Sequence, residues 1–162
     1  MRRVALFAVI LFILIADQTT KQLARIEIAG RAPRHYGVLT LLYAENRGAF
    51  LSLGTNFPKG VRTVVFDVVV AIGLVIATFV LFRGKLKHGD DVALAMIIAG
   101  GVGNLICRLR FSGRVTDFLY LAAGPLHTGV FNVADMAITL GVIWLMTSWM
   151  FTSWSRAVPP PR

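Results

Sequence analysis

Four long stretches of apolar residues constrain this chain more than any other feature of its sequence. A helix needs about 20 mostly apolar residues to cross the hydrocarbon core of a bilayer. The stretches run over residues 4–20, 61–82, 92–108 and 130–151 of a chain that is 56% hydrophobic and only 15% charged. An average soluble domain is less apolar and more charged than this. The sequence therefore predicts an all-α integral membrane protein with four transmembrane helices.

The formal net charge of +9 raises the question of nucleic-acid binding. The Lys and Arg residues flank the apolar stretches instead of forming one soluble basic patch, and no nucleic-acid-binding motif accompanies them. We therefore expect no nucleic acid, and we expect the cations to contact the headgroups of membrane lipids. The single cysteine, Cys107, excludes a disulfide framework and a metal site built from several cysteines.

The distribution of Lys and Arg also predicts an orientation and a domain division. These residues are densest near both termini and in the short turn between the second and third stretches, so both termini are expected to be cytoplasmic. The long first loop contains residues 36–44, which are rich in strand-forming side chains and predict a small extracytoplasmic β element. Residues 1–155 are expected to form one domain, followed by a disordered cytoplasmic tail at 156–162.

Two aspartates are the strongest candidates for chemistry. Asp135 shares a helical face with Asn132 near one end of the fourth stretch, and Asp117 lies in the loop just before it. Two carboxyl groups held close together share a proton, so that one activates water as a base while the other donates a proton. An alternative is structural: Asp117 caps a helix and Asp135 pairs with Arg108. Spacing alone does not separate these hypotheses.

Other polar residues lie inside or beside the apolar stretches, where a charged group is costly. In the third stretch Asn104 and Arg108 follow a run of glycines, which predicts close helix packing with a site-supporting role for the two polar residues. Asp17 and Lys21, four residues apart, are either an interfacial ion pair or part of a site. Asp67 in the second stretch has no role that the sequence explains.

Five short motifs recur in order between the predicted helices, and together they resemble the bacterial lipoprotein signal peptidases, also called signal peptidase II. They are Asp17-Gln-x-x-Lys21, Asn46-Arg-Gly48-Ala49-Phe50, Gly103-Asn104-x-x-x-Arg108, Gly113-x-Val115-x-Asp117-Phe118 and Phe131-Asn132-x-Ala134-Asp135.

The resemblance implies an aspartyl endopeptidase of the bacterial cytoplasmic membrane, with Asp117 and Asp135 as its catalytic pair near the extracytoplasmic face. Its substrate would be a diacylglyceryl-modified prolipoprotein, cut before the lipidated cysteine, and globomycin-type cyclic peptides would inhibit it. The extracytoplasmic loops would form a β cradle and a short lid helix. The resemblance implies no metal or cofactor, and we expect a monomer. The residues that would line or support the site are Asp17, Lys21, Asn46, Gly48, Asn104, Arg108, Asn132 and Ala134.

One position departs from the family. The third-helix motif usually reads Asn-x-x-Asp-Arg, but this chain has Cys107 before Arg108. A carboxylate there could pair with Arg108, so the thiol leaves Arg108 to seek another partner, such as Asp117, Asp135 or Asp17. Two further hypotheses therefore stay open: a diverged, non-catalytic member that binds lipoproteins or lipopeptides, and a small proton-coupled transporter.

Overall fold

The structure, a computed structural model, describes residues 2–48, 56–84, 86–87 and 89–157. Four helices in it are long and apolar enough to cross a membrane, as the sequence predicts. They are α1 (Arg2–Glu27), the continuous helix made of α2 (Lys59–Arg62), η2 (Thr63–Val69) and α3 (Val70–Arg83), α4 (Asp90–Arg110), and α5 (Val133–Ala157).

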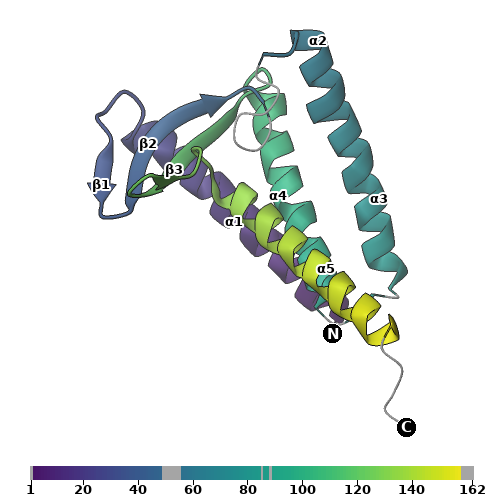
Figure 1. The fold of residues 1–162 in the computed structure, drawn as a ribbon. Coiled ribbons are helices and arrows are strands. Elements are labelled where there is room, and N and C mark those ends of the chain that lie inside the picture. Colours follow the sequence, from purple (N-terminus) through teal and green to yellow (C-terminus); the bar gives the residue numbers. More distant parts are fainter. Residues whose placement is uncertain (1, 49–55, 85, 88, 158–162) are drawn as a thin grey trace.

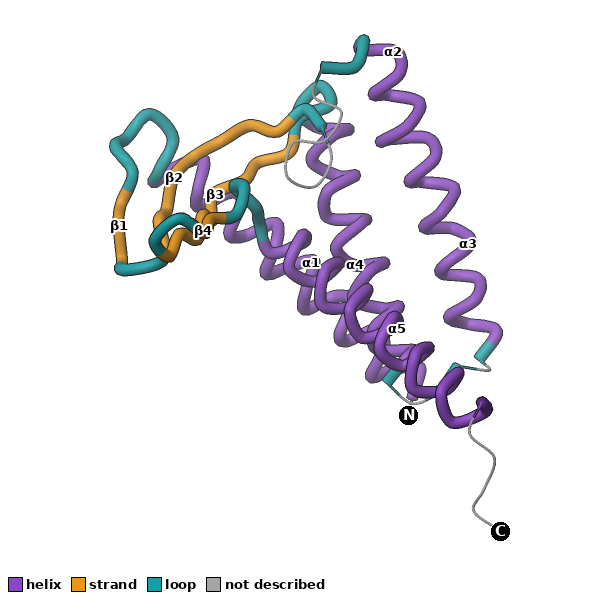
Figure 2. Tube along the Cα trace, viewed as in Figure 1, coloured by secondary structure: helices purple, strands orange, loops and turns teal. Residues whose placement is uncertain are grey.

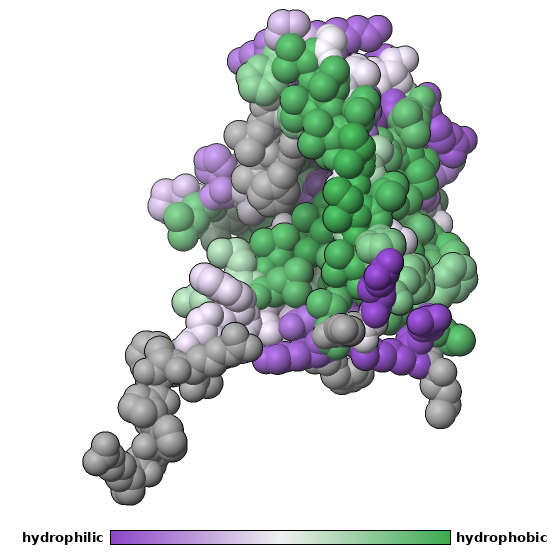
Figure 3. Space-filling model, turned by 90° about the vertical axis from the view of Figure 1, so that its right-hand side faces the viewer, coloured by the Kyte–Doolittle hydropathy of each residue, from purple (hydrophilic) through white to green (hydrophobic). Residues whose placement is uncertain are grey.

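The four helices alternate in direction, so that the start of α1 and the end of α5 lie at the same end of the bundle (Figure 1). Helix α4 packs against α1, α3 and α5 and is the most enclosed of the spans. The helix over Lys59–Arg83 is the least enclosed, with 6% of its apolar window buried. Apolar side chains form a broad band on this side of the molecule, and hydrophilic residues gather at both ends of the band (Figure 3). The band matches the surface that a lipid bilayer would cover.

Small residues bring α4 and α5 into close contact. A Cβ atom added to Gly100 of α4 would collide with the backbone oxygen of Ala134 and with Ile138 of α5. The prediction that the glycines of this helix serve close packing is therefore confirmed. At the other end of the bundle Leu6, Leu81 and Ile98 form a buried apolar cluster that joins α1, α3 and α4.

An antiparallel sheet lies at the end of the bundle away from the termini (Figure 2). Its strands, in the order β1-β2-β3-β4, are β1 (Arg34–Tyr36), β2 (Leu39–Asn46), β3 (Val115–Ala123) and β4 (Leu126–His127). The β element predicted in the first loop over residues 36–44 is confirmed as β2, and β1 lies mostly before it. The prediction was incomplete, because β3 and β4 come from the loop between α4 and α5, and the long β2–β3 pairing is a contact that local strand propensity does not reveal.

Several helix boundaries also differ from the prediction. Helix α1 continues to Glu27 because Ala24 and Ile28 pack against Phe118 of β3, which supports the helix beyond its apolar stretch. Helix α5 begins at Val133 instead of residue 130 and extends to Ala157. Residues 158–162 of the predicted tail, and the stretch 49–55 that follows the sheet and includes Ala49 and Phe50, lie outside the described residues.

Candidate active site

Asp117 is the buried centre of a polar cluster where β2, β3 and α5 meet. It lies on β3 opposite Ala44 of β2, in the part of the pairing next to a register shift between Leu41 and Ala44. Its side chain accepts two hydrogen bonds, one on each oxygen: from Asn132 Nδ2 to Oδ1 at 2.6 Å and from Asn46 Nδ2 to Oδ2 at 3.1 Å. Asp117 is 2% exposed and lies in a strand, so the alternative that it caps a helix is wrong.

Asp135 lies in the first turn of α5 and forms a reciprocal cap with Asn132. The backbone N–H of Asp135 donates to Asn132 Oδ1 at 3.0 Å, and the backbone N–H of Asn132 donates to Asp135 Oδ2 at 3.2 Å. This is the geometry of a capping box, with Asp at the position that Glu or Gln often occupies. Asn132 therefore precedes the helix, whereas the sequence placed it within the helix. Because its amide also binds Asp117, Asn132 connects the two carboxyl groups.

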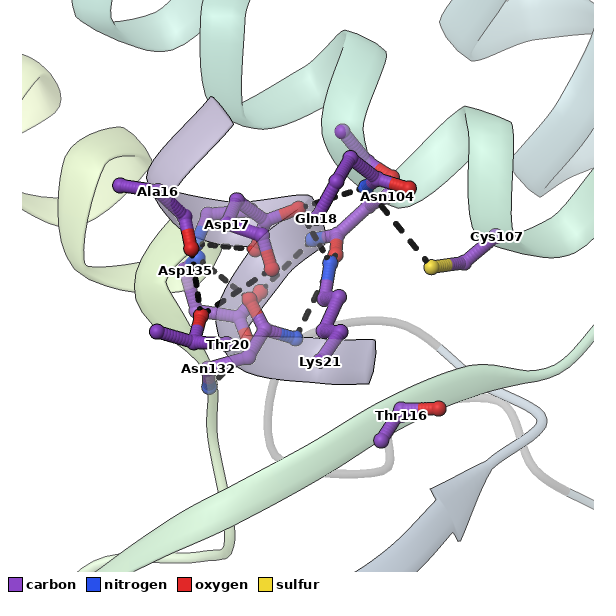
Figure 4. A network of polar contacts seen from close by, with 12 residues as sticks. Ala16, Asp17, Gln18, Thr20, Lys21, Asn104, Cys107, Thr116, Asn132 and Asp135 are labelled. Carbon is purple, nitrogen blue, oxygen red and sulfur yellow. Dashed lines mark hydrogen bonds and ion pairs between the residues drawn. The ribbon is translucent and has the colours of Figure 1, made fainter. Parts of the chain in front are cut away.

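Helix α4 supplies the second support for Asp135. Asn104 Nδ2 donates to Asp135 Oδ1 at 2.9 Å, and Asn104 Oδ1 accepts from Lys21 Nζ at 2.8 Å. The Nδ2 of Asn132 also donates to Asn104 Oδ1, at 3.3 Å. Asn104 therefore links a cation on α1 to the carboxyl group on α5, as expected for a residue that supports the site (Figure 4).

Asp17 and Lys21 form a fully buried ion pair on α1. Both side chains are 0% exposed, and Lys21 Nζ lies 2.8 Å from Asp17 Oδ2. The other oxygen of Asp17 accepts the backbone N–H of Ala134 at 2.9 Å, and Gln18 adds a donor to Oδ2. The predicted ion pair is therefore confirmed, and its contacts with Asn104 and Ala134 make it part of the cluster as well. The predicted residue Ala134 takes part through its backbone, which holds the start of α5 against α1.

Arg108 supports the site from the other side, through the chain after β2. Its Nη2 donates to the carbonyl oxygen of Gly48 at 2.8 Å, and the N–H of Gly48 donates to Asn46 Oδ1 at 2.8 Å. Since Asn46 binds Asp117, Arg108 acts on the carboxyl group through two intermediates. None of the four ion pairs among the described residues includes Arg108, so the alternative that it pairs with Asp135 receives no support.

Cys107 faces α1, away from Arg108. Arg25 Nη2 lies 3.5 Å from its Sγ, and the same guanidinium donates through Nε to Thr116 Oγ1 at 2.9 Å and covers the Phe111 ring. Adjacent side chains on a helix point about 100° apart. The side chain at position 107 therefore points toward Arg25, and the side chain of Arg108 points toward Gly48. The cation next to position 107 is therefore Arg25.

Arg25 is the site-proximal residue that the sequence analysis missed. It holds Thr116, the residue directly before Asp117, and so ties β3 to α1. Asp17, Lys21 and Arg25 follow each other at intervals of four, which places them on one helical face. This spacing could have identified Arg25, but the helix was expected to end with the apolar stretch at residue 20, before Arg25.

Burial controls the charge of Asp117. Removal from water raises the pKa of the Asp117 carboxyl to about 6, and the nearby negative charge of Asp135 adds to the rise. The hydrogen bonds from Asn132 and Asn46 oppose it. A carboxyl group with this pKa exchanges its proton in the range where a proteolytic acid or base works.

An apolar groove of about 460 Å³ leads to Asp135. It lies between the β3–β4 hairpin and the first turns of α5, and its walls include Leu121, Phe131, Met136 and Leu140. The groove can accept an apolar chain and bring it beside a carboxyl group. Among the residues that the structure describes, no group of three or more His, Cys, Asp or Glu side chains is placed to hold a metal ion.

The sequence was compared with protein families and with known proteins. The family described as Signal peptidase (SPase) II matches residues 9–151. The chain belongs to the signal peptidase II family. Within this family it is 38% identical to the lipoprotein signal peptidase of Geobacter sulfurreducens, over 83% of this chain and 84% of the relative. It is 37% identical to the lipoprotein signal peptidase of Sphingopyxis alaskensis, over 87% of this chain and 81% of the relative.

Solved structures agree with the fold of this signal peptidase II chain. A bacterial membrane enzyme determined by the in meso method at 2.3 Å resolution superposes with a TM-score of 0.80 and 22% identity, covering 98% of this chain and 94% of the other. A second bacterial membrane enzyme, at 1.9 Å resolution, gives a TM-score of 0.73 and 24% identity. At these identities the likeness shows the fold alone.

Proposed function

We propose that this chain is an aspartyl endopeptidase that removes the signal peptide from diacylglyceryl-modified prolipoproteins and cuts before the lipidated cysteine. The observation that carries the proposal is the pair of buried carboxyl groups, Asp117 and Asp135, joined through Asn132 at the end of an apolar groove. Membership of the signal peptidase II family supports a prolipoprotein as the substrate.

The two aspartates divide the proton transfers. We assign the starting proton to Asp117, whose pKa burial raises to about 6, and the role of the base to Asp135. A water molecule attacks the scissile carbonyl carbon as Asp135 takes its proton and Asp117 gives its own proton to the carbonyl oxygen. Asp135 then passes its proton to the leaving nitrogen as the C–N bond breaks. Asp117 recovers a proton as the carbonyl group re-forms, and the pair returns to its starting state.

The supporting residues keep this pair in place. Lys21 and Asn104 hold Asp135, while Asn46, Gly48 and Arg108 form the hydrogen-bonded route to Asp117. Preorganised donors of this kind stabilise developing charge without moving during the reaction. Cys107 lies beside Arg25, outside both routes, which favours the catalytic hypothesis over a diverged member that only binds lipopeptides. No observation in the described structure favours the transporter hypothesis.

The apolar groove suggests how the substrate is held. We assign it to the apolar part of the precursor next to the scissile bond, because it opens beside Asp135. Globomycin-type cyclic peptides would compete for the same site. We place the chain as a monomer in the bacterial cytoplasmic membrane, with the sheet and the aspartates at its extracytoplasmic face.

Substrate and cut site are tested together with the purified chain in detergent. A diacylglyceryl-modified prolipoprotein and the same precursor without its lipid are incubated separately, and the products are identified by mass spectrometry. We expect one cut, directly before the lipidated cysteine, and only in the modified precursor. Equal cutting of the unmodified precursor, or a cut elsewhere, would contradict the assignment. Retention of the precursor without any cut would favour the non-catalytic hypothesis.

A further inference from the structure

A second cavity, of about 220 Å³, lies between α2–η2 and the sheet-proximal end of α4. Its charged lining residues are four cations and one carboxylate, which leaves a formal charge of +3. They are Arg47, Lys59, Arg62, Arg108 and Asp67. The groove beside Asp135 is lined by β3, β4 and α5, so the two cavities share no wall residue. Charge of this sign and density selects an anionic ligand.

Two buried polar atoms in the wall of this cavity have no hydrogen-bond partner among the described residues. They are the Nε of Arg108, a donor, and the Oδ1 of Asp67, an acceptor. Arg108 is only 8% exposed, so its guanidinium is held in place by burial, by Gly48 and by the ring of Phe66. An unpaired buried polar group destabilises the fold, and a matching ligand would offset this cost. The ligand that matches both atoms offers an anionic acceptor and a hydroxyl donor.

The backbone at this wall is also unusual. Thr63–Val69 form a π-helical segment inside the second spanning helix, and both Phe66 and Asp67 belong to it. Such segments are rare and frequently occur at functional sites. Both residues line the cavity.

The surroundings of the cavity indicate where the ligand comes from. Val64, Val65 and Val68 of the same helix are exposed apolar side chains, on the surface that faces lipid. The hydrophilic residues above this apolar band lie at the level where phospholipid phosphates would sit (Figure 3). An acyl chain can therefore follow the valines while its headgroup enters the cavity.

We propose that this cavity binds the headgroup of an anionic phospholipid, with the phosphate on Arg47, Lys59 and Arg108 and a glycerol-type hydroxyl on Asp67. The proposal goes beyond the peptidase activity, because the diacylglyceryl group of the substrate carries no phosphate. Arg108 also reaches Asn46 through Gly48, so a bound lipid would stabilise the segment that holds Asp117.

Binding is tested by native mass spectrometry of the full chain in detergent, titrated with phosphatidylglycerol or phosphatidylcholine of the same acyl length. We expect one retained phosphatidylglycerol, bound at least tenfold more tightly than phosphatidylcholine. Each cation near an anionic headgroup contributes roughly fivefold in affinity. The double variant Arg47→Ser/Lys59→Ser is therefore expected to weaken phosphatidylglycerol on the order of 25-fold, without loss of thermal stability.

The matched control is Arg83→Ser/Lys87→Ser, which removes one cation at the opposite end of the same helix and one in the turn that follows, and which leaves lipid affinity unchanged. Phosphatidic acid lacks the glycerol hydroxyl of the headgroup, so we expect the wild type to bind it less tightly than phosphatidylglycerol. Asp67→Leu removes the acceptor for that hydroxyl and should abolish this difference, and a difference that persists in the variant would overturn the role given to Asp67. Equal binding of phosphatidylglycerol and phosphatidylcholine overturns the proposal, as does an equal loss in the control variant. Binding of inorganic phosphate as tightly as the lipid would also overturn it, since the site would then recognise a free anion. All of these experiments measure lipid binding and none measures cleavage, so their result does not depend on the peptidase assignment.

Discussion

Asn132 connects the two carboxyl groups through separate atoms: its side-chain amide binds Asp117, and its backbone N–H binds Asp135. A shift of this residue would move both hydrogen bonds at once. The bridge explains how a strand residue and a helix residue from different elements keep a fixed relation. Spacing alone did not decide whether Asp117 and Asp135 form a pair, because the bridge depends on where α5 begins.

Asp117 predicts a pH dependence of stability. Its pKa is raised to about 6 in the fold, above its ordinary value of 3.8, so the fold retains its proton more strongly than the unfolded chain does. The contribution is full below about pH 4 and disappears as the pH rises through about 6. Unfolding in detergent should show this loss, on the order of 3 kcal/mol at about 1.4 kcal/mol per pKa unit. Asp117→Asn should reduce this slope, and an unchanged slope in the variant would contradict the assignment.

Replacing Cys107 with aspartate, the residue that the resemblance implies at this position, is expected to raise stability. In Cys107→Asp the new carboxylate faces Arg25, and a charge-assisted hydrogen bond should raise the free energy of unfolding by about 1 kcal/mol. Cleavage should stay within about twofold of the wild type, because Arg108 keeps its bond to Gly48. Cys107→Ala serves as the control for loss of the thiol. A large rise or fall in cleavage in Cys107→Asp would show that position 107 acts on the aspartates after all.

At the scale of elements, the site is assembled by contacts between segments that are far apart in sequence. The start of α5 is fixed to α1 by Asp17, to α4 by Asn104 and to β3 by Asn132 and by the backbone pairing of Phe131 with Leu119. The close approach of α1 and α4 depends on Gly103, where an added Cβ would lie 2.6 Å from Asp17 Oδ2.

Gly103→Ala is therefore expected to displace Asp17 and to lower the free energy of unfolding by roughly 1–3 kcal/mol, the usual cost of overpacking. Cleavage should fall with it, because Asp17 holds the backbone of Ala134 next to Asp135. The matched control is Gly73→Ala on α3, where an added Cβ meets nothing within 4 Å. Thermal unfolding and cleavage of both variants measure the difference. Equal behaviour of the two would contradict the role given to Gly103.

The sequence predicted those features that depend on local pattern. The four spans follow from apolar length, and β2 follows from the strand-forming side chains of residues 36–44. The inclusion of β3 in the sheet, the extension of α1 and the partner of Cys107 depend on long-range packing, which local pattern does not encode. The aspartates were identified because charged side chains beside apolar spans are rare. Arg25 was missed because it lies beyond the apolar stretch.

At the scale of the whole molecule, the sheet and the candidate site lie at the opposite end of the bundle from the start of α1 and the end of α5 (Figure 1). The distribution of Lys and Arg predicts that the termini are cytoplasmic. The sheet is therefore expected on the extracytoplasmic side, where signal peptides of exported precursors emerge.

Single cysteines can test this orientation in a Cys107→Ala background. Tyr36→Cys lies at an exposed position of β1, and Arg83→Cys lies at the other end of the bundle. A membrane-impermeant maleimide added to intact cells should label the first, and it should label the second only after the membrane is opened. The reverse pattern would place the site on the cytoplasmic side.

The central claim is that Asp117 and Asp135 act together as the catalytic pair. The direct measurement is the rate of cleavage of a diacylglyceryl-prolipoprotein by the purified wild type and by Asp117→Asn, Asp135→Asn and Asp90→Asn. Asp90 begins α4 at the end away from the site, so its variant should cut at the wild-type rate. The account predicts that each of the other two loses at least about 100-fold, the usual size of an acid or base contribution. Cleavage within tenfold of the wild type by either Asp117→Asn or Asp135→Asn would contradict it.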